Sequence, residues 1–382
     1  MKQNRFELAQ IIQQFAKPFV QKYKPNAYYL RVLSAIIQCR TASLGWHEMA
    51  CDQCAEVTYS YNSCRNRHCP KCQGAKQVFW IEDLMQATLP VKHYHIVFTL
   101  PHQLNEVCLH NSAAYYNLLF AAVWDTLRAF GYAYFGTETG AVCVLHTWGQ
   151  NLSLHPHIHC IVPAAGLSLS GNWKYIGPSG KYLYPVTKLS VDFRSHFMKA
   201  LKASLKKQAL LAQYQSIIDT AWDKPWVVHC EPSMARPDHV VRYLGQYTQK
   251  VAITNNRILD ISNNHVTFLH KDYSDKARQK PVTLDGVEFL RRFCMHILPL
   301  RFVKIRRFGV YSSVYKTMVQ KAKPKTEIKS AIKESNHERL LRITGFDILL
   351  CPVCKQGRLH KIREIPRIRS PGTFITINVN NQ

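Results

Sequence analysis

Three histidines alternate with apolar residues in the segment 154–163 (LHPHIHCIVP). If this segment is a β-strand, successive side chains point to opposite faces, so His155, His157 and His159 share one face. Imidazoles held side by side on a rigid strand are suited to binding a divalent metal ion. A half-buried strand with incidental histidines would explain one of them. For the close pair His157 and His159, with a third histidine beside it, we favour a metal site.

A second group of chemically active residues lies on the helix expected at about residues 236–250. Tyr243, Gln246, Tyr247 and Lys250 fall at i, i+3, i+4 and i+7, so they form one stripe on that helix. Tyrosines at this spacing are more often core residues than catalytic ones. Buried lysine and glutamine side chains, however, need partners. A metal ion and a phosphate in front of the stripe would provide them.

The histidine strand and the tyrosine stripe together fit attack on a phosphodiester. A tyrosine hydroxyl, with a pKa of about 10, is a poor nucleophile at neutral pH. A divalent cation on the scissile phosphate would withdraw charge and align the attack. Lys250 could lower the pKa of the tyrosines or balance the developing negative charge. The pattern predicts a site that nicks and rejoins DNA through Tyr243 and Tyr247, leaving a 5′-phosphotyrosine and a free 3′-hydroxyl.

Two Cys-x-x-Cys turns predict a structural zinc site near the N-terminus. Each turn places two thiolates on one side, and two turns complete a tetrahedron. The predicted ligands are Cys51, Cys54, Cys69 and Cys72, with Cys64 and His68 as alternatives. Residues 61–68, between the turns, are basic and polar, which suits either phosphate contact or a solvated loop. Near the other end, Cys351 and Cys354 form a lone turn of the same kind, for which zinc binding and a simple turn both remain open.

Residue patterns also predict the elements that must hold these groups. Strands are expected at residues 93–101, 141–148, 154–163 and 226–229, and a hairpin at 255–261 and 265–269. The strands at 141–148 and 154–163 are expected to pair as an antiparallel hairpin. Helices are expected within residues 4–40 and at 75–87, 111–130, 191–211 and 236–250.

Composition restricts the class of protein. Lysine and arginine total 50 against 24 acidic residues, a formal charge of +26 over 382 residues, and such a surplus favours a polyanionic partner such as nucleic acid. We find no bilayer-spanning apolar run and no signal peptide, so a cytoplasmic location without membrane contact is expected. In that reducing compartment the 13 cysteines indicate metal ligands and buried thiols. The sequence has no Gly-x-x-x-x-Gly-Lys-Ser/Thr loop, which argues against an intrinsic helicase.

At the level of whole motifs, the chain resembles the rolling-circle, two-tyrosine branch of the HUH endonucleases. Within that branch it is similar to the insertion-sequence transposases of the insertion-sequence-ninety-one type. The resemblance rests on four segments, which occur in the family's order: residues 62–72 (NSCRNRHCPKC), 98–101 (FTLP), 154–163 and 243–257.

The resemblance implies an α+β fold, in which helices surround an antiparallel sheet and the metal-binding histidines lie on a central strand. It implies that His157 and His159 bind Mg²⁺ or Mn²⁺ and that Tyr243 and Tyr247, on a neighbouring helix, are the nucleophiles. A third metal ligand is expected. Gln246 is the candidate, with His155 and His95 as alternatives. The expected partners are single-stranded DNA at the transposon ends, target DNA and a host helicase.

Three regions are expected on this interpretation. Residues 1–90 would be a helical and zinc-ribbon DNA-binding domain, residues 91–315 the HUH nuclease domain, and residues 316–382 a basic linker and tail. The arginines expected to contact DNA are Arg65, Arg67, Arg242 and Arg257. Two other functions remain open: a plasmid or phage rolling-circle replication initiator with the same chemistry, and a zinc-dependent nucleic-acid-binding regulator without catalysis.

Overall fold

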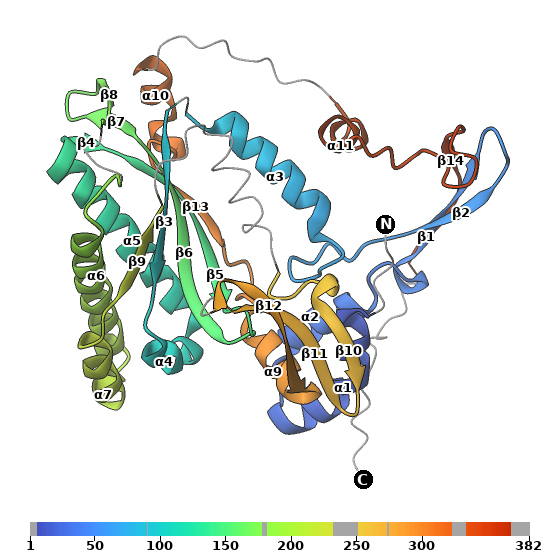
Figure 1. The fold of residues 1–382 in the computed structure, drawn as a ribbon, viewed down its shortest axis with the longest axis horizontal. Helices are drawn as coiled ribbons and strands as arrows, with labels where there is room; N and C mark the ends of the chain where they lie inside the picture. The colour runs from blue at the N-terminus through green and yellow to red at the C-terminus, as the bar shows by residue number, and fades with distance from the viewer. Residues whose placement is uncertain are drawn as a thin grey trace.

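A five-stranded antiparallel sheet lies at the centre of the protein (Figure 1). The computed structural model describes residues 6–89, 91–177, 182–231, 251–272, 275–322 and 334–367. The strand order is β13-β5-β6-β3-β9. These strands are β3 (His93–Thr99), β5 (Gly140–Trp148), β6 (Leu154–Pro163), β9 (Val227–Cys230) and β13 (Ile305–Gly309). The histidine strand β6 is therefore central, and its antiparallel pairing with β5 confirms the predicted hairpin.

Residue alternation along β6 determines what each face of the sheet contacts. Leu154, Ile158 and Cys160 point into the main hydrophobic cluster. That cluster is completed by the helices α5 (Ser112–Phe135), α6 (Val186–Lys207) and α7 (Leu211–Trp222). His155, His157 and His159 alternate with these residues and are half-buried on the opposite face, as predicted. The helix α3 (Gln73–Ala87) packs on that opposite face through Leu84 (Figure 1).

A second hydrophobic cluster joins the first two helices to a segment more than 200 residues later in the chain. It contains α1 (Leu8–Tyr23), α2 (Ala27–Ile37), β10 (Ile258–Ser262), β11 (His265–Asp272), β12 (Arg278–Asp285) and α9 (Gly286–Met295). Two of these helices begin at side-chain caps: Asn26 accepts a hydrogen bond from the backbone N–H of Tyr29, and Asp285 accepts from Val287 and Glu288. The predicted hairpin corresponds to β10 and β11, whereas β12 and α7 were absent from the predicted elements.

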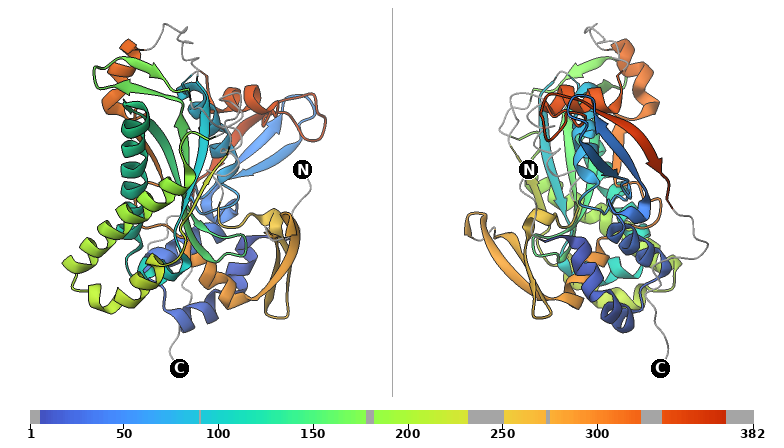
Figure 2. Two further views of the ribbon diagram at one scale, coloured as in Figure 1. Left: turned by 60° about the vertical axis from the view of Figure 1, so that its left-hand side comes forward. Right: turned by 90° about the vertical axis from the view of Figure 1, so that its right-hand side faces the viewer.

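A small sheet combines the two ends of the described chain. β1 (Trp46–Cys51) pairs with β2 (Val57–Tyr61) on one side and with β14 (Leu359–Ile365) on the other. Both views in Figure 2 show β14 beside this N-terminal hairpin. The helix α11 (Asn336–Thr344) lies against α3. Part of the region expected to be a C-terminal tail thus completes an N-terminal sheet.

The remaining elements are peripheral. They are α4 (Asn105–His110), α10 (Lys316–Ala322) and a small sheet of β4 (Thr137–Glu138), β7 (Ala165–Ser168) and β8 (Trp173–Tyr175). Antiparallel sheets surrounded by helices give the α+β class that was predicted. In the part of the chain that the structure describes, none of the helices has the length and apolarity required to cross a bilayer.

Candidate functional site

Three histidines from two adjacent strands converge on the face of the central sheet that lies opposite the main hydrophobic cluster. His146 comes from β5, and His157 and His159 come from β6; one ring nitrogen of each lies within 4.8 Å of the others. The pairing register explains the convergence, because His146 lies directly opposite His157 and Val144 lies opposite His159. Three imidazoles on one side of an ion leave the remaining coordination positions open to substrate or water.

The surroundings of His157 keep its metal-facing nitrogen available. Its Nδ1–H donates to the backbone carbonyl of His155 at 2.7 Å, which leaves Nε2 as the nitrogen with a lone pair. Burial, together with the neighbouring His155, lowers the pKa of His157 to about 4. His157 is therefore neutral at pH 7, as a metal ligand must be.

His159 is held from behind by a chain of two further side chains. His95 Nε2 lies 2.9 Å from His159 Nδ1, and the other His95 nitrogen, Nδ1, lies 3.2 Å from Glu231 Oε2. Such a carboxylate–histidine relay orients a metal-binding imidazole and increases its basicity. His95 therefore contacts a candidate ligand and lies outside the three-histidine group.

The predicted catalytic residues have three different outcomes. The structure brings His157 and His159 together, places His155 and His95 outside the group, and adds His146, which the sequence analysis missed. Gln246, Tyr243, Tyr247, Lys250 and Arg242 lie outside the described residues. A signal for His146 existed in the sequence. The predicted strand 141–148 contains it, and an antiparallel register for the predicted hairpin would have placed it opposite the histidine strand.

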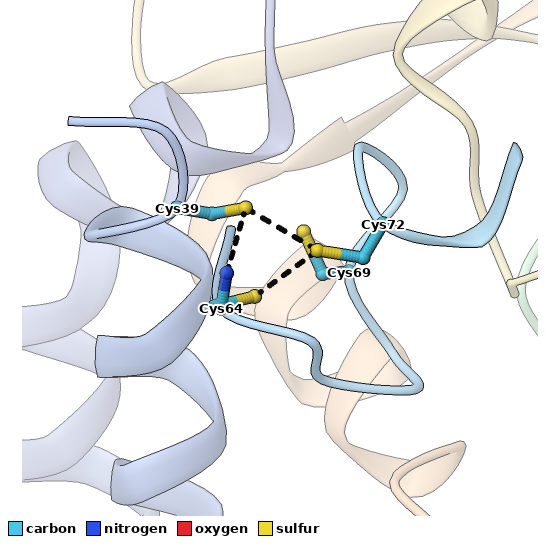
Figure 3. A group of neighbouring side chains, drawn as sticks. All are labelled: Cys39, Cys64, Cys69 and Cys72. Atoms are coloured by element: carbon cyan, nitrogen blue, oxygen red, sulfur yellow. Dashed lines mark hydrogen bonds between the residues drawn. The ribbon is translucent and has the colours of Figure 1, made fainter. Parts of the chain in front are cut away.

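The first cysteine group lies where α2, the loop before α3 and the start of α3 meet (Figure 3). It consists of Cys39, Cys64, Cys69 and Cys72, whose sulfurs lie within 4.8 Å of one another. The Sγ atom of Cys72 is 3.4 Å from that of Cys39 and 3.5 Å from that of Cys64. The backbone N–H of Cys64 donates to Cys39 Sγ at 3.4 Å. Hydrogen bonding from Cys64 is the main cause that lowers the pKa of the Cys39 thiol, and hydrogen bonding with Cys39 is the main cause that raises the pKa of Cys64 and Cys69. The four thiols therefore share their protons, and the fit to a zinc ion rests on the closeness of their sulfurs.

The cysteines are grouped differently from the predicted zinc ligand set. Cys51 and Cys54 form the turn between β1 and β2, whereas Cys69 and Cys72 follow the return strand. The six residues of β1 span roughly 20 Å at 3.3 Å per residue, so they separate the two turns by a distance that one ion does not bridge. Cys64, named as an alternative, is in the first group together with Cys39, which the sequence analysis missed. His68 is in neither group, and burial lowers its pKa to about 3.

Cys51 and Cys54 instead meet the lone C-terminal turn. Cys51, Cys54, Cys351 and Cys354 form a second group within 4.8 Å, which links residues about 300 positions apart. Eight of the 13 cysteines, all of which the structure describes, thus form two groups of four.

The arginines predicted to contact DNA differ in how much of each side chain is free. Arg65 is exposed. Arg67 is half-buried and donates to the backbone carbonyl of Phe302 at 2.5 Å. Arg257 donates to three backbone carbonyls, those of Leu269 at 2.7 Å, Ala252 at 3.3 Å and Gln150. Its guanidinium is used within the protein, which differs from the expected DNA contact.

Comparisons with known proteins agree with this division into a metal-binding N-terminal part and a central sheet. A family model described as "Transposase zinc-binding domain" matches residues 11–100, and one described as "Putative transposase" matches residues 140–318. The "Putative transposase y4qJ" of Sinorhizobium fredii is 36% identical over 390 residues, which cover 96% of this chain and 97% of that protein. The "Transposase for insertion sequence element IS801" of Pseudomonas savastanoi pv. phaseolicola is 28% identical over 289 residues, 73% of this chain and 69% of that protein. No solved structure matches the chain.

Proposed function

Since the chain belongs to the IS91-like family of transposases with an N-terminal zinc-binding domain, we propose that it nicks and rejoins single-stranded DNA at transposon ends. The reaction would be metal-dependent and would follow a rolling-circle scheme. Host helicase activity would supply the single strand.

The observation that carries this proposal is the three-histidine group. His146, His157 and His159 lie on a central, rigid strand pair, on the face of the sheet opposite the main hydrophobic cluster. A divalent ion bound there, Mg²⁺ or Mn²⁺, would polarise the scissile phosphate and favour attack on phosphorus. The backbone carbonyl of His155 fixes the tautomer of His157, and His95 orients His159. These contacts fix the orientation of the His157 and His159 rings before substrate binds. Electrostatic stabilisation of a transition state requires groups that are oriented in advance in this way.

Tyr243 and Tyr247 are the proposed nucleophiles. The proposal rests on their spacing in the sequence, which places them on one face of the expected helix together with Gln246 and Lys250. The tyrosine hydroxyl would release its proton as its oxygen attacks phosphorus, the bond from phosphorus to the 3′ oxygen would break, and the 3′ oxygen would take up a proton and leave as a hydroxyl. The 5′ side would remain esterified to tyrosine. Because the new ester conserves the energy of the phosphodiester, a 3′-hydroxyl can reverse the step and rejoin the strand. Lys250 would balance the charge that develops on the phosphate.

The N-terminal cysteines would support DNA binding and would not take part in catalysis. Zinc held by Cys39, Cys64, Cys69 and Cys72 would fix the loop of residues 64–72, since a closed site of four thiolates is structural. That loop presents Arg65 to solvent, where its guanidinium could contact a DNA phosphate.

A covalent-adduct assay tests the proposal. The protein is incubated with a labelled single-stranded oligonucleotide from the end of its own element and Mg²⁺ or Mn²⁺, and denaturing electrophoresis detects protein-linked label. We expect an adduct that chelator abolishes and that is lost in the double variant Tyr243→Phe, Tyr247→Phe. Tyr59→Phe, which changes an exposed tyrosine on β2, is the matched control and should retain the adduct.

Two results would contradict the proposal. Failure to form an adduct with any divalent metal would favour a non-catalytic DNA-binding regulator. Retention of the adduct in the double tyrosine variant would assign the attack to another residue.

A further inference from the structure

The second cysteine group lies at the tip of the small sheet built from both ends of the chain. Cys51 and Cys54 form the turn after β1, and Cys351 and Cys354 form a turn that precedes β14. β1 and β14 pair antiparallel, with Cys51 opposite Leu359, so the pairing brings the two turns together. Figures 1 and 2 show these segments side by side.

The two turns have nearly the same backbone geometry. The residue after the second cysteine has a left-handed conformation in each turn: Ala55 and Lys355 both have a φ of 57°. The N–H of Ala55 donates to the carbonyl of Cys51 at 3.2 Å, and the N–H of Lys355 donates to that of Cys351 at 3.1 Å. Neither residue is glycine, so each conformation is disfavoured for the isolated chain and must be stabilised by its surroundings.

Backbone amides also point at the sulfurs. The N–H of Gln53 lies 3.4 Å from Cys51 Sγ, and the N–H of Gly357 lies 3.3 Å from Cys354 Sγ. Gly357 is buried against the opposite turn, where a Cβ atom would overlap the sulfur of Cys51. Hydrogen bonds to sulfur favour thiolates, which are the form that binds a metal.

The sulfur positions match a tetrahedral zinc ion. With Zn–S bonds of about 2.3 Å, a regular tetrahedron places its sulfurs about 3.8 Å apart. The Cys51 and Cys354 sulfurs are 3.7 Å apart, and those of Cys54 and Cys351 are 3.8 Å apart. Each of these pairs joins one N-terminal and one C-terminal turn.

The C-terminal segment has almost no apolar core of its own. Of the described residues 334–367, the buried ones are Cys351 and Gly357. Polar contacts attach the segment to α3: Arg339 pairs with Glu82 at 2.5 Å, and Arg342 pairs with the same carboxylate at 2.6 Å. Between 15% and 42% of each of these side chains is exposed, so solvent screens the ion pairs and weakens the attachment they provide. A segment with so little buried apolar surface generally requires a metal or a disulfide to remain folded.

We propose that Cys51, Cys54, Cys351 and Cys354 bind a second structural zinc ion, which closes a zinc ribbon from the two ends of the chain. The ion fixes β14 against β1 and holds α11 on α3. Since α3 begins directly after Cys72, the C-terminal segment is thereby attached to the part of the chain that the first cysteine group organises. This proposal does not depend on the proposed nuclease activity.

Cobalt substitution of the full-length protein tests the proposal, because thiolate–cobalt charge-transfer absorption counts sulfur-bound metal and does not report a histidine site. We expect two sulfur-bound ions per chain, and one in the double variant Cys351→Ser, Cys354→Ser. Val353→Ser, which places serine at an exposed position of the same turn, is the control and should retain two. One ion in the unmodified chain, or two in the double cysteine variant, would overturn the proposal.

Two additional measurements separate loss of the ion from general misfolding. Hydrogen exchange of residues 359–365 should accelerate at least tenfold in the double cysteine variant, while α1 keeps its protection; unchanged exchange in β14 would count against the ion's role. Cys354→His retains a zinc ligand, so it should bind two ions with a shifted spectrum. Its failure to bind the second ion, with α1 still protected, would contradict a metal site at this turn.

Discussion

His146 and His157 lie directly opposite each other on the antiparallel strands β5 and β6. Their ring centroids are 5.4 Å apart, and the ring planes are nearly perpendicular at 86°. One histidine from each strand, together with His159, can therefore direct a ring nitrogen towards the same ion. This arrangement makes His146 the described residue best placed to be the third metal ligand, the position for which Gln246 was predicted.

Replacement of His146 by alanine should therefore act like replacement of His157. We expect His146→Ala to reduce DNA cleavage by more than about 100-fold, because one of three ligands is removed. Binding of single-stranded DNA should change by less than about threefold, since the backbone phosphates dominate affinity. Adduct formation and fluorescence anisotropy on the same oligonucleotide measure the two effects. Full cleavage by His146→Ala at limiting metal would exclude His146 as a ligand.

His95 is expected to be a positioning residue. His95→Gln should weaken the affinity for the catalytic metal by about 10- to 100-fold, because the orientation of His159 is no longer fixed. Excess Mn²⁺ should then restore most of the cleavage rate, which a directly catalytic role would not allow. His155→Gln, which leaves the backbone carbonyl that accepts from His157 in place, is the matched control. A metal titration of the cleavage rate for each variant separates these outcomes.

Strand periodicity made part of this site predictable. Alternation along residues 154–163 was enough to place the three histidines on one face, and the pattern of 141–148 was enough to predict the partner strand. The contribution of His146 depends on the pairing register, and β5 and β6 are irregular between His146 and Trp148. A register of this kind follows from the turn and from packing, so single-strand patterns do not specify it.

The cysteine groups show a different limit. Cys-x-x-Cys spacing indicates that a turn can present two thiolates, but it says nothing about which other turn completes the tetrahedron. Residues 51–54 and 69–72 are near each other in sequence, and the β1–β2 hairpin separates them in space. The actual partner of the first turn lies about 300 residues later, and its position depends on the pairing of β14 with β1. Pairing between distant strands is a tertiary property that local spacing does not encode.

Acid should destabilise the protein through His296. This buried side chain bonds Thr147 Oγ1 at 3.2 Å through Nδ1 and the carbonyl of Leu152 at 3.1 Å through Nε2, and burial lowers its pKa to about 4. As the pH falls, the histidine is protonated in the unfolded chain at about pH 6.5, well before it is protonated in the folded protein. The stabilising contribution is therefore complete above pH 6.5 and is lost as the pH falls towards 4.

The expected size of this loss is roughly 3 kcal/mol of unfolding free energy across that window. Urea unfolding at pH 7 and pH 4.5 measures it, and His296→Gln, which does not titrate, should show a pH dependence smaller by about that amount. Burial also lowers the pKa values of His93 and His157 to about 4 and that of His68 to about 3, so part of the acid sensitivity should persist in the variant. An identical pH dependence in both proteins would rule out His296 as the source.

Arg257 and Arg65 should separate stability from DNA binding. Arg257→Ala leaves three backbone carbonyls without their donor, so we expect a loss of roughly 2–5 kcal/mol of unfolding free energy. Arg65 is exposed, and Arg65→Ala should leave stability within about 0.5 kcal/mol of the parent protein. If Arg65 contacts a phosphate, the slope of log affinity against log salt should become shallower by about 0.7 for a single strand in Arg65→Ala.

Both variants are measured in the same two ways: urea unfolding gives their stability, and fluorescence anisotropy at several salt concentrations gives their affinity for single-stranded DNA. A normal stability for Arg257→Ala together with a reduced salt slope would instead place Arg257 at the DNA.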